Sequence, residues 1–240
     1  MQTKTTVLSL LSALGLCACG GGGSNPGSGM PYAYVEPVVN QTRTYGEVVV
    51  DNSNNTINLG YSDTTTAASA AGATQLSQST TGDSTIVDGT NYAVITENQD
   101  FNEYGQETTY TYVGTGGNTV TCTFTPHGPG PDWPLRVGAT WQTTYTFACD
   151  SGTPVTYSQT GTVADVEQVT VPAGTYTALK LQSTLAWTDA NGTARTQTIS
   201  NWRDVATSMT VKQEVAIAVS GTPPATGYAV SRTLVLESVS

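Results

Sequence analysis

The stretch TYTALKLQSTLAW, residues 175–187, decides the fold class of this chain. Leu179, Leu181 and Leu185 alternate with Lys180 and Gln182, so one face of the segment is apolar and the other is polar. A period of two is typical of a β-strand that covers a core with one face. We therefore expect a strand whose leucine face packs on a core and whose lysine face lies in water or lines a polar groove.

Similar segments surround this strand in the C-terminal part of the chain. They comprise residues 140–149, 154–163, 193–202, 209–220 and 228–239. Short polar turns separate them, and consecutive strands joined in this way form an antiparallel meander. The apolar spacing changes from two to three between Val166 and Val169, which predicts a β-bulge near Glu167 and Gln168.

The part of the chain before residue 140 is expected to add shorter strands. Residues 43–50, 84–87 and 92–97 are strand candidates, and residues 106–113 and 118–125 predict a hairpin. Residues 64–83 are rich in Ala, Thr, Ser and Gly but have no apolar stripe, so we expect a loop with one short helix there.

Two irregular segments flank these strands. Residues 30–41 contain Pro31 and Pro37 among apolar neighbours and are expected to form an extended leading segment that docks on the domain. Residues 126–134 are dense in proline, which lacks an amide donor, so they cannot form a sheet ladder. They are expected either to link two subdomains or to cross the end of a barrel.

The N-terminal residues have the features of an export signal. Lys4 supplies a positive charge, and residues 5–16 form an apolar run of about a dozen residues, the length of a signal-peptide core. A membrane-spanning helix needs about 20 residues. We therefore expect residues 1–18 to be cleaved from the mature protein.

The cleavage site resembles the lipobox of bacterial lipoproteins. Leu16 stands at position minus three, Ala18 at minus one and Cys19 at the acceptor position. Cys17 is the alternative acceptor, and an ordinary secretory signal with incidental cysteines is the other interpretation. The resemblance implies three acyl chains (diacylglycerol and palmitate) on the acceptor cysteine and a membrane anchor. Gly20 stands where the retention signal for the inner membrane has Asp, which favours the bacterial outer membrane.

The sequence divides into five expected regions. These are the signal peptide (1–18), the lipidated Cys19 with a flexible tether (19–40), an N-terminal β region (41–126), a linker or loop (127–139) and a C-terminal antiparallel β domain (140–240). The expected fold class is all-β, an antiparallel meander that forms a curved sheet, a half-barrel or a sandwich, with little helix. A net charge of −10 and the lack of a basic cluster exclude nucleic acid as a partner.

Two motifs in the C-terminal half resemble a known β domain. PLRVGATW (residues 134–141) and VTVPAGTYTALKL (residues 169–181) resemble the pattern PLxxGxxW followed by VPAGxYxALKL of uncharacterised bacterial periplasmic proteins and lipoproteins. The resemblance implies a curved antiparallel sheet, wrapped as a half-barrel like envelope lipoprotein carriers, and it brings no catalytic residues. The family's glycine is absent between Trp202 and Val211.

The mature body contains two cysteines, Cys122 and Cys149. Each lies on the apolar face of an expected strand, so both thiols point to the covered side of the sheet. In an exported protein such a pair is most simply a disulfide, and two free buried thiols are the alternative.

Few residues in the chain suggest catalysis or metal binding. His127 is the sole histidine, without a nucleophile elbow in the body of the protein, and we expect a solvated loop residue. Residues 51–55 and 100–105 resemble calcium loops, but each lacks the distant Glu of an EF-hand, and turn chemistry explains both. We therefore expect no metal and no cofactor. The candidate carboxylate pairs for a hydrolase are Asp165 with Glu167 and Asp100 with Glu103.

Aromatic residues are the remaining candidates for a site. Trp141, Tyr145, Trp187 and Trp202 either fill the core or line an open concavity for an acyl chain, a glycan or a peptide. The sequence favours a non-enzymatic, lipid-anchored envelope protein that binds or scaffolds an envelope protein, a glycan or a lipid. The first alternative is a half-barrel carrier or sensor for an apolar ligand, and the second is a hydrolase with a cryptic carboxylate pair.

Overall fold

The computed structural model describes residues 29–69, 71–81, 85–87, 90–92, 96–113, 119–150, 152–189, 192–220 and 228–240. The expected signal peptide and both candidate lipidation sites, Cys19 and Cys17, lie outside the described residues. Over the described ranges the regular structure is β-strand, with no helix. No helical segment in this part of the chain has the length and hydropathy needed to cross a bilayer.

The strands follow one another along the whole described chain. They are β1 (Thr42–Asp51), β2 (Thr56–Ser69), β3 (Gly72–Thr81), β4 (Thr85–Val87), β5 (Thr90–Tyr92), β6 (Thr96–Asn102), β7 (Glu107–Val113), β8 (Thr119–Thr125), β9 (Thr140–Cys149), β10 (Val155–Val171), β11 (Gly174–Thr188), β12 (Ala194–Asp204), β13 (Thr210–Ser220) and β14 (Ala229–Val239).

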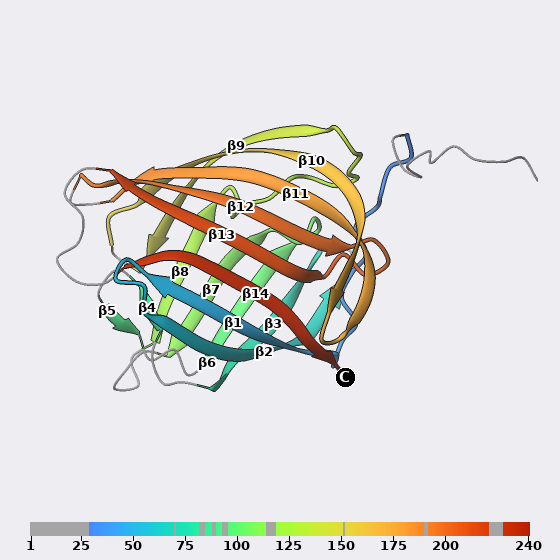
Figure 1. Cartoon of the computed structure of the whole chain (residues 1–240), viewed down its shortest axis with the longest axis horizontal. Helices are drawn as coiled ribbons and strands as arrows, with labels where there is room; N and C mark the ends of the chain where they lie inside the picture. The colour runs from blue at the N-terminus through green and yellow to red at the C-terminus, as the bar shows by residue number, and fades with distance from the viewer. Residues whose placement is uncertain are drawn as a thin grey trace, which may run out of the picture.

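Twelve of these strands form a single closed barrel (Figure 1). The order around the barrel is β1-β14-β13-β12-β11-β10-β9-β8-β7-β6-β3-β2, and every neighbouring pair is antiparallel. β4 and β5 pair with each other as a separate two-stranded sheet. The expected all-β antiparallel meander is confirmed, and its sheet closes on itself instead of stopping at a half-barrel or folding into a sandwich.

The N-terminal β region and the C-terminal β domain share this one sheet. β8 pairs with β9, where Phe124 lies opposite Phe147, and β1 pairs with β14, where Glu47 lies opposite Leu234. These two ladders join the halves of the chain on both sides and leave neither half with an open edge.

Two expectations about local structure were wrong. The region 64–83, expected as a loop with a short helix, forms the end of β2 and the whole of β3. Ala73 and Gln75 of β3 line the barrel interior, so its inner face carries no apolar stripe. The β-bulge expected near Glu167 and Gln168 lies earlier, because the register of β10 on β11 shifts between Val163 and Asp165.

The leading segment and the proline-rich loop pack together over one end of the barrel. Tyr32 and Leu135 exchange two backbone hydrogen bonds of 2.8 Å, and the rings of Tyr34 and Trp133 lie 5.8 Å apart. Trp133 and Leu135 are buried against the inward leucines of β11. The expected docking of the leading segment is confirmed, and the proline-rich loop crosses the barrel end, which was one of its two expected roles.

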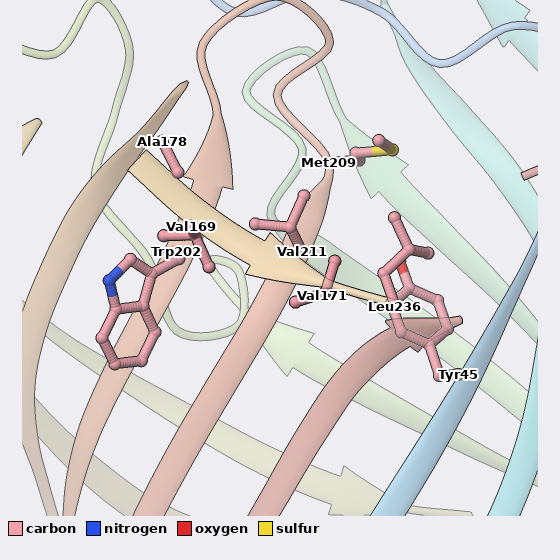
Figure 2. Close-up of a cluster of buried hydrophobic side chains, with 8 residues drawn as sticks. All are labelled: Tyr45, Val169, Val171, Ala178, Trp202, Met209, Val211 and Leu236. Atoms are coloured by element: carbon pink, nitrogen blue, oxygen red, sulfur yellow. The ribbon is translucent and has the colours of Figure 1, made fainter. Parts of the chain in front are cut away.

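The long β10–β11 hairpin bends across the ends of β13 and β14 (Figure 1). The amide of Ala173 at its tip donates to the carbonyl of Leu236. The bend buries the apolar cluster drawn in Figure 2, which comprises Tyr45, Val169, Val171, Ala178, Trp202, Met209, Val211 and Leu236. This hairpin therefore holds the ends of several strands together at one rim of the barrel.

A disulfide and a row of aromatic rings stabilise strands β7 to β11 at the end away from the tip of the β10–β11 hairpin. Cys122 and Cys149 face each other across β8 and β9 and form the expected disulfide. The rings beside it contact one another in sequence, with centroids 4.8–6.3 Å apart, and belong to Tyr110, Phe124, Phe147, Tyr145, Tyr157 and Trp187.

Candidate ligand-binding cavity

The barrel interior contains a partly open cavity of about 590 Å³. The inward side chains of strands from β1 to β14 form its wall, and Tyr34 of the leading segment and Trp133 of the proline-rich loop lie at its covered end. Pockets that bind small molecules have volumes of about 300–1,000 Å³. The cavity is therefore large enough for a small ligand.

Amide side chains make up much of the cavity wall. They are Gln75, Gln99, Gln106, Gln159, Gln197, Asn201 and Gln213. Such groups both donate and accept hydrogen bonds, so they suit a ligand rich in polar groups.

Two of these amides fix the proline-rich loop over the cavity. Gln159 accepts hydrogen bonds from the amide of Gly130 at 2.8 Å and from the indole of Trp141 at 3.3 Å. Gln106 donates to the carbonyl of Gly130 at 3.1 Å and to the carboxylate of Asp132 at 3.0 Å. The loop that covers the cavity is thus held by a residue of β10 and by one that precedes β7.

Carboxyl groups gather on one side of the interior. Burial, together with the nearby Glu97 and Asp63, raises the pKa of Glu107 to about 8. Burial also raises the pKa of Asp63 and of Glu97. Glu107 lines the cavity, and at neutral pH it is mostly protonated and neutral.

Two arginines of the cavity wall have no carboxylate partner among the described residues. Arg43 is only 6% exposed, and its Nε and Nη2 atoms make no hydrogen bond. Arg203 is half-buried, and burial lowers its pKa, with Arg43 adding to the effect against the opposing influence of Tyr34 and Tyr45. In contrast, Nε and Nη2 of Arg232 each lie 2.6 Å from a carboxylate oxygen of Glu47.

One of the four aromatic candidates lines the cavity. Trp141 does so and covers Gly161 of the neighbouring strand, where a Cβ atom would overlap the indole ring. Tyr145 and Trp187 lie in the aromatic row that ends the barrel interior. Trp202 lies in the cluster of Figure 2 instead of lining this cavity.

The position of Trp202 is fixed by charged neighbours. The ammonium groups of Lys180 and Lys212 lie 4.9 and 4.7 Å from its ring centroid, and its indole donates to the carboxylate of Glu167. The polar face expected for β11 is therefore partly covered, because Lys180 rests on this ring.

The other sequence candidates make local contacts. His127 is half-buried, and its Nδ1 lies 2.8 Å from the carbonyl oxygen of Gly128. Asp51 accepts hydrogen bonds from the amides of Ser53 and Asn55, as the turn interpretation requires.

The candidate carboxylates also have nearby partners. Asp100 accepts hydrogen bonds from the hydroxyls of Thr74 and Thr109 at 2.8 Å. Asp165 accepts one from the amide of Val166, whereas Glu167 is bound to Trp202. The described ranges contain no group of three His, Cys, Asp or Glu side chains placed to hold a metal ion.

The charged residues of the interior were missed at the level of the sequence. Arg43 alternates in phase with Tyr45 and Val49, which is the one signal that could have placed it inside. Arg203 shares a face of β12 with Ile199. The neighbouring Trp202, on the opposite face, is the residue that the sequence suggests for a binding site. In a strand of an exported protein a charged side chain ordinarily faces solvent, so the sequence pattern did not predict charged residues inside the barrel.

Comparisons of the sequence alone with known proteins found no relative. The sequence matches no protein-family profile. It also has no significant similarity to a curated protein sequence.

Solved structures do resemble it. A candidate lipoprotein from Parabacteroides distasonis ATCC 8503 matches with a TM-score of 0.50 at 13% identity, over 87% of this chain and 99% of that one. A candidate exported protein with a YmcC-like fold from Bacteroides fragilis gives 0.47 at 10% identity, over 88% and 100% of the two chains. The hypothetical lipoprotein YmcC from Escherichia coli (K12) gives 0.41 at 12% identity, over 83% and 84%. At these identities the likeness to the Parabacteroides protein establishes a shared fold.

Proposed function

We propose that this protein is a lipid-anchored protein of the bacterial outer membrane whose barrel binds a small polar ligand without transforming it. The observation that carries the proposal is the cavity of about 590 Å³, whose wall includes buried polar atoms that have no hydrogen-bond partner in the described protein. These atoms are Nε and Nη2 of Arg43, Oδ1 of Asp63 and Oδ1 of Asn201. Buried polar atoms without partners are costly, and a bound ligand would satisfy them.

The membrane anchor in this proposal rests on the sequence and on the comparisons. Cys19 follows a signal-like segment and a lipobox-like site, and Cys17 is the alternative acceptor. The structural neighbour from Parabacteroides distasonis is described as a candidate lipoprotein. If Cys19 is acylated, Cys19→Ala releases the protein from membranes and abolishes palmitate labelling. Continued labelling of this variant would move the acceptor to Cys17.

The character of the wall argues against a carrier for an apolar ligand. An acyl chain would leave the amides of Gln75 and Gln213 without water. A compact ligand with several hydrogen-bonding groups avoids this cost. The cavity thus favours a polar ligand over the apolar one considered from the sequence.

One observation favours a second candidate function, acid catalysis. Glu107 has a pKa of about 8 beside Glu97 and Asp63, and a carboxyl group that stays protonated at neutral pH can act as a general acid. Under this alternative the wild-type protein would convert the ligand, and Glu107→Gln would bind it without converting it. Under our proposal both proteins return the ligand unchanged.

The test compares two substitutions on one strand. Ser183 of β11 lines the cavity, whereas the next residue, Thr184, is exposed on the outer face. Ser183→Phe fills the cavity, and Thr184→Phe is the matched control. The full-length protein is purified from the membranes of its own organism, and the small molecules it holds are measured by native mass spectrometry and by extraction.

We expect a molecule to copurify with the wild type and with Thr184→Phe, and its occupancy to fall at least tenfold in Ser183→Phe. A second cavity-filling change, Ala73→Leu, serves if Ser183→Phe fails to fold, since Ala73 also lines the cavity. Equal occupancy in the filled and control variants, or no bound molecule in the wild type, would refute binding in the cavity.

A further inference from the structure

The arginines of the described chain fall into two groups. Arg232 is paired with Glu47, and Arg195 is paired with Asp189 at 3.3 Å. Arg43 and Arg203 lie in the cavity wall and form no ion pair within the described ranges, and Nε and Nη2 of Arg43 make no hydrogen bond.

An unpaired guanidinium is expensive at this depth. Taking a charge out of water costs several kcal/mol unless an opposite charge and hydrogen bonds replace the water. Two such groups close enough to influence each other add mutual repulsion, and Arg43 does act on Arg203 in this way. A position that costs stability is retained most simply for a role other than stability.

Asp63 lies opposite Arg43 on the neighbouring strand, but Nε and Nη2 of Arg43 do not bond to it. Asp63 lies close enough to Arg43 for the two charges to influence each other, yet Oδ1 of Asp63 and Nε and Nη2 of Arg43 all lack a hydrogen-bond partner. Burial also raises the pKa of Asp63. The Nε and Nη2 donors of Arg43 therefore remain available to a ligand.

We propose that Arg43 and Arg203 bind an anionic group of the cavity ligand, a carboxylate or a phosphate. This inference rests on the proposed function, because it assumes that the cavity holds a ligand. The planar guanidinium presents several donors in a fixed fork that matches both anions, and the bonds to an ionised acceptor are short and strong. The amides of the remaining wall then contact the rest of the ligand.

The experiment measures the binding of two simple anions to the full mature protein. The probes are inorganic phosphate and acetate, each titrated at constant ionic strength against a chloride background by calorimetry. The variants are Arg43→Gln, Arg203→Gln and the double substitution, and Arg136→Gln is the control because Arg136 is exposed. We expect the wild type and the control to bind at least one probe, each single variant to bind at least tenfold more weakly, and the double variant to show no binding.

Thermal unfolding without ligand separates a binding role from a structural one. If Arg43 serves the ligand, Arg43→Gln removes an unpaired buried charge, so the Tm of the empty protein stays level or rises while binding is lost. If Arg43 is structural, the Tm falls. Arg43→Lys keeps the charge but not the fork, so we expect it to fold and to bind more weakly than the wild type.

The two probes also distinguish the ligand classes. Binding of phosphate alone assigns a phosphorylated ligand, and binding of acetate alone assigns a carboxylate. A wild type that binds neither anion, or an Arg43→Gln variant that binds like the wild type, overturns the inference. If the copurifying molecule still disappears in Ser183→Phe, the cavity remains a ligand site and only the anion site fails.

Discussion

Replacing Glu107 by Gln is expected to stabilise the barrel at neutral pH. Burial and two neighbouring carboxyl groups raise the pKa of Glu107 from its ordinary 4.5 to about 8. Below pH 4.5 the folded and the unfolded chain both hold the proton, so the group costs nothing. Between these values the unfolded chain releases the proton and the folded chain retains it, so the free energy of unfolding of the wild type falls as the pH rises.

The size of the effect follows from this difference in pKa. Each pKa unit corresponds to about 1.4 kcal/mol, so the wild type loses about 3 kcal/mol between pH 4.5 and 7 through this group. The loss levels off once the pH exceeds about 8. Gln is neutral at every pH and has nearly the same shape, so Glu107→Gln should gain this amount at pH 7 and nothing at pH 4.5.

The assay is urea unfolding followed by tryptophan fluorescence at pH 4.5, 6, 7 and 8. The exposed Glu36 provides the control, and Glu36→Gln should change stability by less than about 0.5 kcal/mol at each pH. A gain in Glu107→Gln that is equal at all four pH values would show that the carboxyl group is not held protonated. A loss of stability at pH 7 would show that the ionised form makes favourable contacts.

Three further changes test other parts of the structure. Removing the disulfide by changing both Cys122 and Cys149 to Ala should cost about 3–4 kcal/mol in urea unfolding, because the bond closes a loop with a sequence separation of 27; an unchanged midpoint would contradict this. Gly161→Ala should cost about 1–3 kcal/mol, since its Cβ overlaps the ring of Trp141. A double-mutant cycle with Trp141→Leu should remove most of that cost, and additive effects would argue against the contact. His127→Ala should change stability by less than about 0.5 kcal/mol and leave ligand occupancy unchanged, and loss of the ligand from a folded variant would place a site at the loop.

The strands that the sequence identifies are those with contrasting faces. In β11, Leu179 and Leu181 face the core, and Lys180 between them faces outward, so the period of two is plain. The hairpin of β7 and β8 and the pairing of Cys122 with Cys149 follow from the same contrast. Where one face is apolar and the other polar, alternation alone predicts the strand and the direction of its side chains.

The rest could not be predicted because this barrel is polar on both faces over much of its circumference. In β3, Gln75 points into the cavity, while the half-buried Leu76 points the other way. A strand arranged in this way has no apolar stripe, so its sequence pattern predicts a loop. Closure of the sheet depends on pairing between β1 and β14, which no local pattern encodes, and the cavity with Arg43 and Glu107 follows only from closure.

The pairing of β1 with β14 also determines when the barrel can close. Thr42 and Ser240 exchange backbone hydrogen bonds of 2.8 and 2.9 Å, and the ion pair of Arg232 with Glu47 joins residues 185 positions apart. Until β14 is available, β1 and β13 are two unpaired edges, and such edges recruit other chains. A growing or truncated chain is therefore an open ribbon prone to aggregation, and pairings so distant in sequence form slowly. Pairing of β14 with β1 and β13 removes both edges at once.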